Sequence, residues 1–190
     1  SAAVGFNFFS SGFNADKDEK SMRVLLWNVS RWDEPNKKAK GGLSFRPHMM
    51  DAIYLQNADV ICLQEFFEPR DDGYYEHNIS ALEAMGYSHH YFYISSAVVN
   101  GSYQFGLFIA SKHPIVDSGK VSFGETPHSE GLAWADIDFN GKRFRVYSVH
   151  MESARMGRYS YFNPEDGARH AATQLVRAYI HRSGQADLVR

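Results

Sequence analysis

The fold is decided by the stretch Ala58-Asp59-Val60-Ile61-Cys62-Leu63-Gln64-Glu65 (residues 58–65). Its apolar run is bounded by polar residues, which predicts a buried strand from Asp59 to Glu65. A second run of this kind, residues 22–29, predicts another buried strand earlier in the chain. Between the two runs lies a helical pattern that Ser44 can cap and that stops near Asn57. The order strand, helix, strand predicts two parallel strands joined by a right-handed crossover.

A polar side chain closes each of these two strands: Asn28 ends the first and Glu65 ends the second. Neighbouring parallel strands bring their carboxyl ends to the same edge of a sheet, about 5 Å apart. At that distance the amide oxygen and the carboxylate can both bind one hard cation such as Mg²⁺. The alternative is structural: Asn28 starts a turn, and Glu65 marks where a buried strand meets water. Two oxygen ligands alone do not complete a metal site.

Further along, Asn140-Gly141 separates two β-prone runs, 132–139 and 142–150, and predicts a hairpin with a two-residue turn. The second run ends on His150, whose imidazole can hydrogen-bond a phosphate oxygen. A structural or surface histidine is the alternative, because a site must be argued from several groups together.

The other elements follow from the same local signals. Tyr103 and Gln104 precede a predicted strand, where they are candidates for substrate contact and equally for ordinary residues of a sheet edge. Asn78 can cap a short helix that Gly86 stops. The remaining predicted elements are strands over 87–95, 104–111 and 115–123, and a helix that opens at Asn163-Pro164 and closes at Gly184.

Length and composition limit the class of protein. The chain has 190 residues, of which 44% are apolar, enough for one globular domain with a buried core. Its formal net charge of -2 argues against strong nonspecific binding to a polyanion, while a local basic groove stays open. No apolar stretch approaches the roughly 20 residues that a membrane helix needs. The single cysteine, Cys62, is predicted to be a core residue, and residues 1–21, rich in Phe, to be a flexible arm.

Four segments, in order and with their spacing, resemble the endonuclease/exonuclease/phosphatase superfamily, which has the deoxyribonuclease I-like fold. The segments are residues 25–29, 58–65, 106–115 and 146–150, and the resemblance covers about residues 22–182. It implies an α+β protein built as a two-layer sandwich of mixed β-sheets flanked by helices. The active site of this fold lies at one end of the sandwich.

The resemblance also implies roles for individual residues. Asn28 and Glu65 match the positions that bind Mg²⁺ (or Mn²⁺), and His150 matches the residue that contacts the scissile phosphate. Gln64 lies beside the metal ligand and would support it. Ser148 occupies a position where the family often has an asparagine, which puts a local supporting hydrogen bond in question. In this family a divalent cation neutralises charge on the phosphate and leaving group while water attacks in line.

Two later motifs of the family have no counterpart in the sequence. An Asp-x-Asn segment and a closing Asp-His pair should follow a helix that ends near His181, and the chain stops at Arg190. Asp187 has no asparagine two residues later, so it is not a candidate for the first motif. We therefore expect residues 22–190 to be the N-terminal part of a domain. The missing C-terminal part of the same domain would complete it and carry the groups that activate water.

The predicted function is that of a magnesium-dependent phosphodiesterase or phosphatase. Its substrate is left open among nucleic acid, phospholipid and small phosphate esters. Some bacterial relatives that the chain resembles carry membrane spans before the domain. By that analogy, membrane association through a segment before residue 1 stays open. The sequence does not fix the location of the protein, and a membrane-anchored or an extracytoplasmic one is the alternative that the analogy adds. The alternative class is a noncatalytic binding module that keeps the sandwich and has lost the chemistry.

Overall fold

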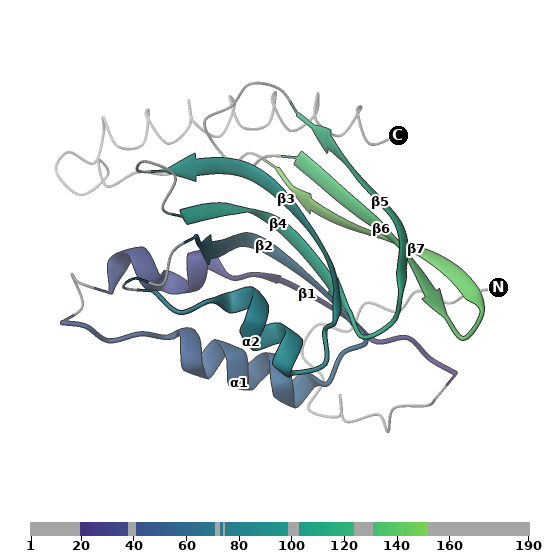
Figure 1. Ribbon diagram of the computed structural model, residues 1–190, viewed down its shortest axis with the longest axis horizontal. Coiled ribbons are helices and arrows are strands. Elements are labelled where there is room, and N and C mark those ends of the chain that lie inside the picture. The colour runs from purple at the N-terminus through teal and green to yellow at the C-terminus, as the bar shows by residue number, and fades with distance from the viewer. Residues whose placement is uncertain are drawn as a thin grey trace, which may run out of the picture.

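In the computed structural model, two β-sheets pack against each other and two helices cover the outer face of the larger sheet (Figure 1). The structure describes residues 20–37, 41–70, 73, 75–98, 103–123 and 131–151. Nearly all of the predicted arm, the predicted helix from Asn163 to Gly184 and Asp187 lie outside the described residues. In the described part, no helix is both long enough and apolar enough to span a membrane.

The larger sheet has the strand order β1-β2-β4-β3 and is mixed, because β1 and β2 are parallel and the other pairs are antiparallel. The smaller sheet has the order β5-β6-β7. Its described strands are all antiparallel, so the expectation of mixed sheets holds for the larger sheet only. The α+β sandwich itself is confirmed. The elements are β1 (Val24–Asn28), η1 (Ser30–Asn36), α1 (Arg46–Gln56), β2 (Val60–Pro69), α2 (Asn78–Ala84), β3 (His89–Val98), β4 (Tyr103–Ser111), β5 (Ile115–Ser122), β6 (Gly131–Phe139) and β7 (Lys142–His150).

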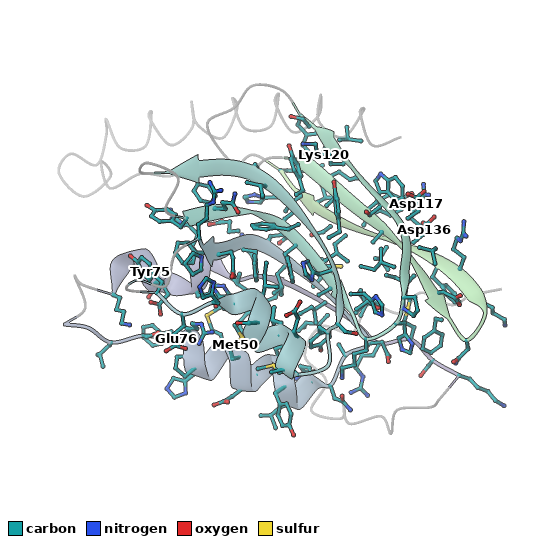
Figure 2. The ribbon with its side chains drawn as sticks, in the orientation of Figure 1. Met50, Tyr75, Glu76, Asp117, Lys120 and Asp136 are labelled. Carbon is teal, nitrogen blue, oxygen red and sulfur yellow. The ribbon has the colours of Figure 1, made fainter. Side chains whose placement is uncertain are left out.

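β2 is buried on both faces, as its apolar run predicts. Ile61 and Leu63 belong to the core between the larger sheet and the helices, where Met50 of α1 also packs (Figure 2). Val60 and Cys62 belong to a second core between the two sheets. Burial raises the pKa of the Cys62 thiol to about 12, so this cysteine is a protonated core residue at neutral pH. The other fully or largely buried members of the second core are Tyr93, Leu107, Ile109, Ala133, Ala135 and Ile137.

The predicted unit of strand, helix and strand is present. β1 and β2 are parallel neighbours, and their register places Asn28 opposite Gln64. α1 lies between them in sequence, and its C-terminal capping residue Asn57 has the left-handed backbone conformation common at helix ends, with φ 45°. The end of β1 therefore lies beside residues 64–65 of β2, a strand that continues to Pro69.

Neither helix begins with the capping residue that the sequence suggests. Phe45 holds the capping position of α1, and the hydroxyl of Ser44 accepts the N–H of Arg46 at 3.2 Å. Asn78 is the first residue inside α2, because the Glu68 carboxylate accepts the first two N–H groups of that helix, at 2.9 and 3.0 Å. The Asn78 amide is buried and accepts a hydrogen bond from Arg46 Nε at 2.6 Å. A carboxylate from β2 thus replaces the expected local cap.

The predicted hairpin between β6 and β7 is confirmed. Asn140 and Gly141 form its turn with positive φ values of 54° and 75°, as a two-residue turn of this type requires. The Asp138 carboxylate accepts the N–H of Gly141 at 3.0 Å. The register then runs from Phe139 opposite Lys142 to the last residue of β7, His150, opposite Gly131. The hairpin therefore delivers the predicted histidine to a strand end.

A charged pair joins β6 to β7 close to this turn. The guanidinium of Arg145 donates two hydrogen bonds to the Asp136 carboxylate, at 2.6 and 2.9 Å, and lies 3.9 Å above the ring centroid of Trp134. Figure 2 shows the position of Asp136. Hydrogen bonding to Arg145 lowers the pKa of Asp136 below its ordinary value of 3.8. The ionised carboxylate is thus favoured in the folded protein.

We expect Arg145→Met to lower the thermal unfolding temperature at pH 7. A lowered folded pKa stabilises the protein above the ordinary carboxyl pKa, and that stabilisation is lost as pH falls through the folded pKa. The gap between wild type and variant should therefore narrow below about pH 4, as followed by calorimetry. Lys142→Met, an exposed change on the same strand, is the control. A gap that stays constant between pH 7 and pH 3 would contradict the assignment.

Candidate functional site

The end of β1 and the middle of β2 bring the two predicted metal ligands into direct contact. The expectation that the second strand ends at Glu65 was wrong, because β2 continues to Pro69 in pairing with β4. The Asn28 Nδ2 donates a hydrogen bond to Oε1 of Glu65 at 2.9 Å. The amide oxygen of Asn28 accepts the N–H of Ser30 at 2.9 Å, which fixes the orientation of the amide. The convergence of these two side chains, expected from the shared sheet edge, is present in the structure.

Glu65 reaches this position because β2 contains a β-bulge. The pairing of β2 with β4 jumps from Leu63 opposite Phe108 to Phe66 opposite Gly106, so two residues of β2 share the space of one. Glu65 has a φ of 49° at this point. Without the extra residue, strand alternation would turn Glu65 to the face that Leu63 occupies beneath the helices. Phe66 packs there instead, and the bulge leaves the carboxylate at the sheet edge.

Gln64 links the two sheets beside this bulge. Its side-chain Nε2 donates a hydrogen bond to the carbonyl oxygen of Val149 in β7 at 2.7 Å. The backbone carbonyl oxygen of Gln64 accepts the N–H of Val29 at 3.0 Å. The predicted supporting role of Gln64 thus has a concrete geometry, because this residue joins β1, β2 and β7 next to His150.

His150 lies at the same end of the sandwich as Asn28 and Glu65. Its Nε2 is 3.8 Å from Oε1 of Glu65, too far for a hydrogen bond and close enough for an electrostatic interaction when the imidazole is protonated. The side chain is 19% exposed, so it borders the surface without being free in solvent. Two residues earlier, the buried hydroxyl of Ser148 has no hydrogen-bond partner among the described residues. The supporting bond questioned for Ser148 is therefore not made within this part of the chain.

Sequence reasoning missed Arg31, which also approaches Glu65. Its Nε is 3.9 Å from Oε2 of Glu65. Arg31 lies in a left-handed turn in which four residues in a row, Ser30 to Asp33, have φ between 45° and 57°. Each costs about 1–2 kcal/mol relative to right-handed backbone. Trp32 anchors the turn, since it is fully buried and its indole N–H donates to the carbonyl oxygen of Phe67 at 3.3 Å.

The structure places Tyr103 and Gln104 further from this cluster. In the pairing of β4 with β2, Tyr103 lies opposite Pro69 and Gln104 opposite Glu68, which are four and three residues beyond Glu65. The ring of Tyr103 packs on Phe67, with centroids 5.1 Å apart. Its described role is therefore packing, and substrate contact by Tyr103 or Gln104 stays a prediction.

The donors at the end of the sandwich fit a hard divalent cation. Glu65 offers a carboxylate with 28% of its side chain exposed, and the Asn28 amide oxygen keeps one lone pair beside its bond to Ser30. Mg²⁺ is commonly held by one or two protein oxygens together with water and substrate phosphate. In the described ranges, no group of three His, Cys, Asp or Glu side chains gathers as a metal site. A cation here would thus rely on Glu65, Asn28 and further oxygen ligands.

Sequence comparison assigns the family. Residues 42–187 match the model of the Endonuclease/Exonuclease/phosphatase family. The chain belongs to this family. The match includes Glu65 and His150 and begins after Asn28. No curated protein matches the chain.

The chain is similar to several solved structures, and the first of them shows the shared fold. An endonuclease/exonuclease/phosphatase from Beutenbergia cavernae is 22% identical, with a TM-score of 0.55, over 70% of this chain and 39% of that one. A family protein from Leptotrichia buccalis is also 22% identical, with a TM-score of 0.47, over 70% and 55% of the two chains. Sphingomyelinase C from Streptomyces griseocarneus is 19% identical, with a TM-score of 0.47, over 70% and 49%. The chain thus spans between 39% and 55% of the length of these solved structures.

We expect Gln64→Leu to reduce the free energy of unfolding by about 1–3 kcal/mol, because the Val149 carbonyl loses its donor between the sheets. Urea unfolding at neutral pH measures the change. Gln56→Leu is the matched control, since Gln56 is exposed at the end of α1. Equal effects of the two substitutions would show that the bridge between the sheets contributes nothing.

Proposed function

We propose that this chain carries the cation-binding and phosphate-binding part of a phosphoester hydrolase that depends on Mg²⁺ or Mn²⁺. One observation carries the proposal: Asn28, Glu65 and His150, from three strands of both sheets, meet at one end of the sandwich. Membership of the Endonuclease/Exonuclease/phosphatase family supports the reaction class.

In this proposal Asn28 and Glu65 hold the cation. When bound, such a cation acts as a Lewis acid that neutralises charge on the phosphate and on the leaving group. The protein orients the ligands in advance: the bulge in β2 directs the Glu65 carboxylate, and the Ser30 N–H fixes the Asn28 amide. That orientation directs Nδ2 of Asn28 to Glu65, so a cation held by both side chains would replace this hydrogen bond. The carboxylate itself is already placed for electrostatic catalysis.

His150 is the proposed donor to the phosphate. Its Nε2 lies 3.8 Å from Glu65, so an oxygen held near the carboxylate comes within reach of the imidazole. The hydrogen bond from Gln64 to the Val149 carbonyl holds the neighbouring backbone of β7 against β2. An N–H placed in this way stabilises negative charge that develops on a nonbridging oxygen.

The substrate is proposed only as a phosphate ester. Nucleic acids, phospholipids and small phosphate esters all present this group, and the formal net charge of -2 gives no preference for a polyanion. None of Asn28, Glu65 and His150 is proposed to activate the attacking water. By the family resemblance we propose that the residue with this role belongs to later segments of the same domain.

We expect Glu65→Gln and His150→Ala each to reduce kcat/KM of the full-length protein for bis-p-nitrophenyl phosphate by about 100- to 1000-fold. Glu65→Gln removes the charge that holds the cation, and His150→Ala removes the donor to the phosphate. His48→Ala, at an exposed histidine of α1, is the matched control and should leave the rate unchanged.

The outcomes separate the two classes of function. Hydrolysis that survives both site substitutions would refute the assignment of these residues. A protein that binds Mn²⁺ through Glu65 and hydrolyses no phosphate ester would be a binding module with the family fold. The substrate class would then follow from hydrolysis of DNA, RNA, sphingomyelin and inositol phosphates side by side.

A further inference from the structure

Arg31 is a cation of the candidate site that the proposed function leaves unused. It follows β1 by three residues and points its Nε toward Glu65, at 3.9 Å from Oε2. That Nε is buried and has no hydrogen-bond partner among the described residues. The side chain as a whole is 44% exposed, so other parts of it remain accessible to a ligand.

The ion pair with Glu65 does not account for this arrangement. At 3.9 Å the two groups are beyond hydrogen-bond distance, and a pair that is 44% and 28% exposed contributes little to stability. The backbone nevertheless holds Arg31 in place on both sides. Ser30 donates its N–H to Asn28, and Trp32 is fully buried. A strained turn that is fixed at both ends places a guanidinium at the mouth of the site.

We propose that Arg31 binds a nonbridging oxygen of the substrate phosphate. This inference rests on the proposed function and adds a recognition residue to it. A guanidinium presents its N–H groups in a planar fork that matches phosphate oxygens, and such charge-assisted bonds are short and strong. Glu65 then serves two cations: it ligates the divalent ion and lies beside the guanidinium that receives the phosphate.

The charges at this end of the sandwich favour an anionic ligand. Glu65 contributes one negative charge, Arg31 contributes one positive charge, and His150 contributes a hydrogen-bond donor that is charged when protonated. With a divalent cation on Glu65 the balance is positive, and a phosphate oxygen is the complementary partner for Arg31. The expected ligand is therefore the phosphate group itself, whichever ester it belongs to.

Titration calorimetry with two probes tests the proposal on wild type, Arg31→Met, Arg31→Lys and the control Arg143→Met. Arg143 is exposed on β7 near the hairpin turn, far along that strand from His150. With Mn²⁺ present, Arg31→Met should weaken binding of inorganic phosphate by about 10- to 100-fold. Arg31→Lys keeps the charge and should recover part of the loss. Arg143→Met should bind phosphate as wild type does.

The second probe, Mn²⁺ alone, separates recognition of phosphate from support of the fold. Removing a positive charge beside Glu65 should leave Mn²⁺ binding equal or make it tighter by about two- to tenfold. In steady-state hydrolysis, KM should rise more than kcat falls. Weaker binding of both probes would mean that Arg31 only shapes the site, and phosphate binding within twofold of wild type would overturn the proposal.

Glu65→Gln shows which proposal has failed. If phosphate binding depends on Mn²⁺ and on Glu65 but not on Arg31, the proposed function stands and the role of Arg31 is wrong. If Mn²⁺ does not bind wild type, or binds Glu65→Gln equally well, the cation site itself is wrong. In that case a loss of phosphate binding in Arg31→Met would still identify an anion site.

Discussion

The candidate site depends on the extra residue that β2 holds opposite β4. Between Leu63 and Phe66 the strand places two residues against one, and Glu65 takes a positive φ. Strand alternation alone would bury this carboxylate beneath α1 and α2, where an unpaired charge is costly. The bulge instead gives Phe66 to the core and Glu65 to the sheet edge. Gln64, the other bulged residue, reaches across to β7 and hydrogen-bonds the second sheet beside His150.

The burial of Trp32 beside this bulge offsets the conformational cost of the left-handed turn that contains it. The four left-handed residues of η1 are held because Trp32 is buried against Phe66, with ring centroids 5.8 Å apart, and donates a hydrogen bond to the Phe67 carbonyl. The Asn28 amide serves both partners, since it accepts from Ser30 and donates to Glu65. The same residues of β2 that form the core thus fix the loop that carries Arg31. Substitutions in this part of the core should therefore disturb the site before they disturb the opposite end of the sandwich.

Features with a local cause could be predicted from the sequence, and features that arise from distant contacts could not. The apolar run of β2, the Asn140-Gly141 turn and the meeting of Asn28 with Glu65 follow from strand burial, turn chemistry and parallel pairing. The capping role of Asn78 was wrong, because Glu68, 10 residues earlier, caps α2 from a strand. The capping role of Ser44 was wrong because Phe45 holds that position in α1. Arg31 was missed because its direction depends on a left-handed turn that no residue type announces. The bulge could not be predicted, because Phe67 already fits plain alternation with Leu63 and only the pairing with β4 shows that Phe66 shares their core.

The cation site is the central claim, and it can be seen directly. Crystals of the protein grown with Mn²⁺ and measured near the manganese absorption edge locate the ion by anomalous scattering. The arrangement of Asn28 and Glu65 predicts a peak bound by the Glu65 carboxylate and the Asn28 amide oxygen, with His150 beside it. A peak elsewhere, with Glu65 still bonded only to the Asn28 Nδ2, would contradict the account.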